Sequence, residues 1–157
     1  MDRTTGREAY RAARDMLVRH RDDYDAAVAA FRWPDIGDRF NWVLEWFGPV
    51  AAGNPRTSLR TISEDGTDHS CSFAEMAERS DRLATSLAAS GVAPGDRVMV
   101  MLDNQVELWE SMLAVMKLGA VIMPGTTALG RKDLLDRVGP GGGAPCHHQC
   151  RPGRQIR

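Results

Sequence analysis

Residues 98–123 read VMVMLDNQVELWESMLAVMKLGAVIM, and this stretch decides the fold. It opens with the unbroken apolar run 98–102, which is typical of a parallel strand covered on both faces. A helix is predicted over about 105–118, and a second buried strand is predicted over 120–123. Because strand, helix and strand follow one another, we expect the two strands to be parallel, with a right-handed crossover. Four apolar residues at helical spacing should point inward from the helix: Val106, Trp109, Leu113 and Met116.

A hairpin and a capped helix are predicted immediately upstream. Residues 58–63 and 67–71 read as short strands joined by a turn at Gly66. Ser72 and Glu75 match a capping box, in which each side chain satisfies a free N–H group at the start of a helix. The helix that they begin is expected to bury an apolar face and to stop at a glycine.

The first third of the chain is predicted to be helical. Helices are expected over 5–20 and 22–32, the second with an apolar stripe, and a third over 40–47. Gly48-Pro49 should break or kink the third helix. Tryptophan and phenylalanine residues gather over 31–47, and we interpret them as groups that dock this segment onto a core.

The composition excludes several classes of function. A formal net charge of -1 gives no overall attraction to nucleic acid or to an anionic membrane. No apolar run is long enough for a membrane span, and the charged opening residues do not resemble a secretory signal, so a cytoplasmic protein is expected. Three cysteines, two of them close together, do not form a disulfide framework.

No catalytic or metal site can be read from the residues alone. Asp103 and Glu107 stand four positions apart near a predicted helix start, where capping and the helix dipole explain them better than acid–base catalysis. The cysteines and histidines of 146–150 are zinc-binding residue types, but they lack the two separated ligand pairs of structural zinc sites, so we interpret the cluster as accidental. The sequence therefore assigns no catalytic residue and no metal ligand.

Glycine, charged and proline residues follow a specific order along 72–138. They are Gly91-Val92, Gly95-Asp96-Arg97-Val98, Asn104, Glu107 and Gly119-Ala120-Val121, followed by Pro124. In order and spacing they resemble the opening of the large domain of the acyl-adenylate-forming enzymes, the AMP-binding superfamily. FNWVLEWF at 40–47 and MPGTT at 123–127 point toward its medium-chain fatty acyl-CoA synthetase branch. The resemblance covers roughly residues 22–138.

The resemblance implies a two-step reaction. ATP and a carboxylic (fatty) acid give an acyl-adenylate and pyrophosphate, and CoA then gives the thioester and AMP, while Mg²⁺ offsets the phosphate charge. The phosphate loop ending in Lys and the catalytic Lys of that family have no counterpart in these 157 residues. We therefore expect an amino-terminal part of such a synthetase, truncated before the catalytic machinery, inactive alone and without a cofactor of its own.

The loop after the second predicted strand is the candidate binding site. Ligands in open α/β sheets collect at the carboxyl ends of strands, and the resemblance places the matching loop near the nucleotide of CoA. Gly125 permits close approach of the backbone, and Thr126 and Thr127 offer hydroxyl groups. An ordinary strand-to-helix loop is the alternative.

The predicted fold class is α/β, with amino-terminal helices, a β-hairpin and a β-α-β parallel unit that form the incomplete start of a synthetase large domain. We divide the chain into a helical segment over 1–53, the start of the large domain over 54–138, and a tail over 139–157. The tail has one large aliphatic residue and no periodicity, which predicts disorder, with a frameshift as one origin.

A short non-catalytic α/β interaction module is the alternative function, and a small ligand-binding domain is the third hypothesis. Unpaired strands would allow self-association through exposed sheet edges.

Overall fold

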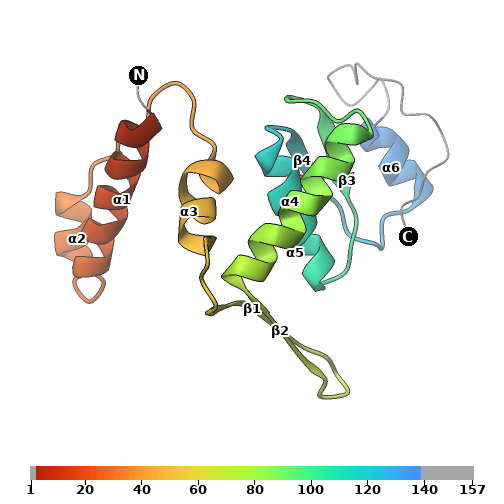
Figure 1. The fold of residues 1–157 in the computed structure, drawn as a ribbon, viewed down its shortest axis with the longest axis horizontal. Coiled ribbons are helices and arrows are strands. Elements are labelled where there is room, and N and C mark those ends of the chain that lie inside the picture. Colours follow the sequence, from red (N-terminus) through yellow and green to blue (C-terminus); the bar gives the residue numbers. More distant parts are fainter. Residues whose placement is uncertain (1–2, 139–157) are drawn as a thin grey trace. The chain divides into compact units, whose positions relative to one another are not determined.

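The structure is a computed structural model that describes residues 3–138 (Figure 1). The chain divides into two compact units, Met1–Ala52 and Gly53–Arg157. The predicted disorder of 139–157 and the cysteine–histidine cluster at 146–150 lie outside the described residues. Within the described part of the chain, no helix combines the length and the apolarity that crossing a membrane requires.

The first unit is helical. Its elements are α1 (Arg3–Arg19), α2 (Tyr24–Ala30), the π-helical turn η1 (Val43–Phe47) and α3 (Gly48–Ala51). Asp23 caps α2, because its Oδ1 accepts a hydrogen bond from the Ala26 N–H at 3.0 Å. The predicted apolar stripe is largely open, since α2 buries none of its residues and Tyr24 is 80% exposed.

Aromatic side chains dock the segment after α2 onto α1. Tyr10 of α1 stacks on Phe40 with ring centroids 5.5 Å apart, and it meets the edge of Trp46 at 5.0 Å. The Trp42 indole N–H donates to the Tyr10 hydroxyl at 3.1 Å. These residues therefore hold α1 to the segment after α2, whereas Trp33 is largely exposed, and docking of the whole segment onto a core stays a prediction.

The predicted third helix differs from expectation at both ends. Its regular part begins only at Val43, and Gly48-Pro49 does not break it, because α3 continues directly from η1. The Gly48 N–H donates to the Val43 carbonyl, five residues back, so the turn is wider than an α-helical one. This widened turn places Pro49 in the first turn of α3, where its missing N–H costs little.

The second unit begins with the predicted hairpin and capped helix. β1 (Thr57–Ile62) and β2 (Asp68–Ser72) are antiparallel, with Arg60 opposite Ser70. The capping box at the start of α4 (Phe73–Ala89) is confirmed. The Ser72 hydroxyl accepts from the Glu75 N–H at 3.1 Å, and the Ser72 N–H donates to the Glu75 carboxylate at 2.8 Å. Gly91 follows α4 with φ of 96°, a left-handed conformation that glycine adopts without strain.

The strand–helix–strand unit is present as predicted. β3 (Arg97–Val100) and β4 (Val121–Pro124) are parallel, with Val98 opposite Ile122, and α5 (Val106–Lys117) connects them. α5 packs against both strands and against α4 (Figure 1). Small residues allow the two helices to approach closely, since Ser80 and Ala114 have no exposed surface. A last helix, α6 (Arg131–Val138), follows β4.

Two expectations about burial in this unit are wrong. Trp109 was expected to point inward from α5 but is 42% exposed, because Glu110, Leu113 and Ala114 occupy the buried line of the helix. The strands were expected to be covered on both faces, yet Val100 is the one buried residue of β3 and β4.

Candidate functional site

The predicted loop begins at the carboxyl edge of the parallel sheet. Pro124, the last residue of β4, lies opposite Val100, the last residue of β3. The Gly125 N–H then donates to the Val100 carbonyl at 3.0 Å, which extends the pairing by one bond. The loop therefore leaves the sheet at the edge where open α/β sheets bind their ligands.

The two threonines of the loop make different hydrogen bonds. The Thr126 hydroxyl accepts from the Ala128 N–H at 3.3 Å, which leaves its own proton available to another acceptor. The Thr127 hydroxyl donates to the Asp103 carboxylate at 2.9 Å. Asp103 thus lies beside the candidate loop, although its sequence position suggested a role at the start of α5. The residue that caps α5 is Gln105, and its side chain makes no capping hydrogen bond.

Gly125 lies close to two side chains of the same chain. A Cβ atom at this position would lie 3.0 Å from Leu129 Cδ1 and 3.2 Å from Met101 Cγ. Both distances are tighter than ordinary van der Waals contact, so a larger residue here would require the Leu129 and Met101 side chains to shift.

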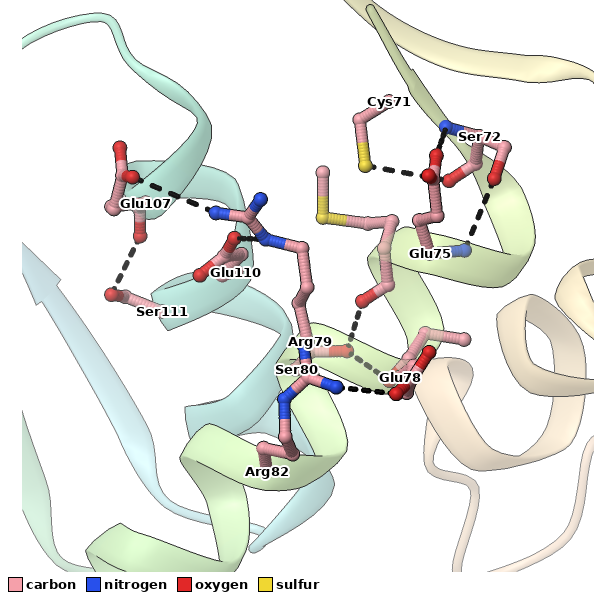
Figure 2. A network of polar contacts seen from close by, with 12 residues as sticks. Cys71, Ser72, Glu75, Glu78, Arg79, Ser80, Arg82, Glu107, Glu110 and Ser111 are labelled. Atoms are coloured by element: carbon pink, nitrogen blue, oxygen red, sulfur yellow. Dashed lines mark hydrogen bonds and ion pairs between the residues drawn. The ribbon is translucent and has the colours of Figure 1, made fainter.

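A polar cluster joins α4 to the first turns of α5 (Figure 2). The Arg79 guanidinium pairs with Glu110, and a second nitrogen lies 3.6 Å from the Glu107 carboxylate. The Glu110 side chain is only 11% exposed, whereas Arg82 and Glu78 form a nearby pair that is mostly in solvent. Lys117 makes a second link, because its ammonium donates to Ser80 at 2.8 Å and to Asp81 at 2.7 Å.

A hollow of about 890 Å³ lies between the hairpin and the beginnings of α4 and α5. Its charged lining residues are mostly engaged with one another. The pairs are Arg60 with Asp68, Arg79 with Glu107 and Glu110, and Arg82 with Glu78. Because these charges are paired with one another, the hollow fits a structural junction between the elements better than it fits a catalytic centre.

Sequence reasoning missed the links made by Arg79 and Lys117. Glu107 lies in the first turn of α5, as its helix-dipole interpretation requires, and its contact with Arg79 adds to that role. The available signal was Glu110, a charged residue one helical turn from Val106 and Leu113 on the expected inner side of α5.

Two titratable groups near this cluster have shifted pKa values. Burial raises the pKa of the Cys71 thiol, which has 5% of its surface exposed. The backbone N–H of Ser72 lowers the pKa of the Glu75 carboxyl, because that hydrogen bond favours the charged form. A buried thiol of raised pKa is a poor nucleophile, so Cys71 is a core residue. Among residues 3–138, no three histidine, cysteine or acidic side chains gather into a metal-binding group.

Solved structures share the fold of this chain. The acyl-CoA synthetase of Brucella canis matches 76% of this chain with a TM-score of 0.66 and 30% identity, over 23% of its own length. The structure of IdnL1 matches 60% of the chain with a TM-score of 0.53 and 26% identity, over 19% of its own length. The two units therefore have the fold found at the amino-terminal end of adenylate-forming enzymes.

Sequence comparison gives the family. The model of the AMP-binding enzyme family matches residues 50–139, and the chain belongs to that family. Acyl-coenzyme A synthetase ACSM3, mitochondrial, of Rattus norvegicus is 37% identical over 138 residues, which are 82% of this chain and 23% of that protein. The uncharacterized acyl-CoA ligase YtcI of Bacillus subtilis is 32% identical over 100 residues, or 64% of this chain and 19% of that protein. The chain spans less than a quarter of the length of these relatives.

Proposed function

We propose that residues 54–138 form the start of the large domain of an ATP-dependent acyl-CoA synthetase, preceded by a helical segment over 1–53, and that the 157 residues by themselves make no acyl-CoA. The parent reaction would join a carboxylic acid to CoA, with ATP converted to AMP and pyrophosphate. The observation that carries the proposal is the match of the family over residues 50–139, which include the hairpin, the capped helix and the parallel unit. The cytoplasm remains the predicted compartment.

ATP, Mg²⁺, CoA and a fatty acid are the proposed ligands of the complete enzyme. Within this chain the proposed contact is to CoA, through the loop that contains Gly125, Thr126 and Thr127. The hydrogen bonds of the loop favour Thr126 for this contact, because the Thr127 hydroxyl already donates to Asp103.

Two assays test this proposal. The purified chain should release no pyrophosphate when it is given ATP, Mg²⁺, CoA and octanoate, and the synthetase of Brucella canis serves as the positive control. Residues 53–138, grafted in place of the matching segment of that synthetase, should preserve acyl-CoA formation. Turnover by the isolated chain, or an inactive graft that is folded, would contradict the proposal.

The interaction module remains the alternative, and the partly exposed sheet is the feature that favours it. Within the described residues β4 pairs with β3 alone, so its other edge is open to pairing with a second chain, and Val121 on this strand is 49% exposed. Sedimentation at increasing protein concentration distinguishes these possibilities. A dimer that dissociates on Val121→Lys would support self-association, and a monomer throughout would not.

A further inference from the structure

We propose that Asp103 is a positioning residue: by accepting the Thr127 hydroxyl, it clips the loop over 125–130 to the end of β3. Only the expected effect on CoA binding rests on the proposed function. The clip itself is a property of this chain and is tested separately.

The clip joins two segments that the sequence separates. Asp103 follows the carboxyl end of β3, and Thr127 follows that of β4, and their side chains meet at 2.9 Å. A hydrogen bond to an ionised carboxylate is stronger than one between neutral groups. The bond therefore holds together the two strand ends that border the candidate site.

The rest of the loop is held at its two ends by other contacts. The Gly125 N–H bonds to the Val100 carbonyl at 3.0 Å, and the Gly130 N–H bonds to the Asp133 carboxylate at 3.2 Å. Between these points, the Leu129 N–H donates to the Thr126 carbonyl at 3.2 Å. The Asp103–Thr127 bond connects the middle of the loop to the residues that follow β3. It therefore fixes the position of the neighbouring Thr126 hydroxyl.

The bond to Asp103 also determines which hydroxyl can donate to a ligand. The Thr127 proton is already donated to the Asp103 carboxylate, so it is not available to an approaching phosphate. A ligand would therefore meet Thr126, whose hydroxyl proton is available, while Thr127 keeps the loop in place.

Amide hydrogen exchange of the full chain, followed by NMR, tests the clip without any need for activity. Thr127→Val keeps the shape of the side chain but removes the donor, so the Ala128 and Leu129 amides should exchange about 3- to 10-fold faster, the effect of one lost hydrogen bond. Thr127→Ser keeps the bond and should exchange like the wild type, whereas Asp103→Asn keeps an acceptor without its charge and should accelerate exchange less than Thr127→Val does. Thr85→Val, on the exposed side of α4, is the matched control.

The grafted synthetase supplies the functional readout. Within an active graft, Thr127→Val and Asp103→Ala should raise the KM for CoA several-fold and change kcat little, and Thr127→Ser should restore the KM. Unchanged amide exchange in Thr127→Val would overturn the clip. Equal losses of kcat in every variant would show that the bond supports the fold and does not position the loop for CoA. A graft that is inactive with the wild-type segment counts against the proposed function, whereas the exchange rates still decide the clip.

Discussion

Replacing Arg79 by methionine tests whether the burial of Glu110 determines the strength of the link between α4 and α5. Methionine keeps an apolar stem but leaves the Glu110 carboxylate, 11% exposed, without its partner. Removing one partner of a fully buried ion pair costs about 3–5 kcal/mol. Because Arg79 is itself 39% exposed, water can reach the site, and we expect a loss of about 2–3 kcal/mol.

Arg82→Met is the matched control, since it lies on the same helix and its pair with Glu78 is exposed on both sides. Its expected cost is below about 0.5 kcal/mol. The assay is amide exchange at Ala114 and Val115, which are fully buried in α5 and report opening of the second unit alone. Arg79→Met should accelerate their exchange roughly 30- to 150-fold, at 1.4 kcal/mol per factor of ten.

A second substitution separates charge from packing. Glu110→Met in the Arg79→Met background removes the stranded carboxylate and should recover most of the lost stability, because apolar replacements of buried ion pairs are often neutral. Equal effects of Arg79→Met and Arg82→Met, or no recovery in the double variant, would refute the argument from burial.

Three further outcomes are expected. Stabilisation of α4 by Glu75 should be complete above the usual glutamate pKa of about 4.3 and disappear as the pH falls below it, because the Ser72 N–H lowers the folded-state pKa. Circular dichroism at decreasing pH checks this, and Glu75→Gln should lack that dependence. Gly6→Ala should destabilise the first unit, although alanine favours helices by about 1 kcal/mol, because the new Cβ would lie 2.7 Å from the Ile36 carbonyl oxygen; faster amide exchange along α1 would verify it. Cys71 should react with a thiol reagent far more slowly than free cysteine, measured in a variant whose other two cysteines are serine, and rapid labelling of the folded chain would contradict its burial.

The elements of the second unit could be predicted because their signals are local. The capping box of Ser72 and Glu75 and the turn at Gly66 depend on neighbours within a few residues. The parallel pairing of β3 and β4 follows from the order strand, helix, strand, since two strands joined by a helical crossover run in the same direction. Family membership rested on a longer pattern of the same kind, an ordered series of residues along 72–138.

The position of the candidate loop was predictable, whereas its role in binding stays a prediction. The sequence placed Gly125, Thr126 and Thr127 after a strand, but it could not distinguish the two threonines. Their difference arises from Asp103, 24 positions from Thr127 along the chain and at hydrogen-bonding distance in space. Nothing in the local pattern of either residue specifies that pairing.

By itself, the sequence determined the fold class, the parallel unit and the family, because helical and strand periodicity, caps and turns act over short distances. The tertiary structure alone decided that Glu110, and not Trp109, joins Leu113 on the buried side of α5. Trp109 has the larger apolar surface, yet Glu110 takes the inner line because Arg79 of α4 satisfies its charge there. A charged residue can occupy a buried position when a partner from another element neutralises it, and that partner appears only when the chain is folded.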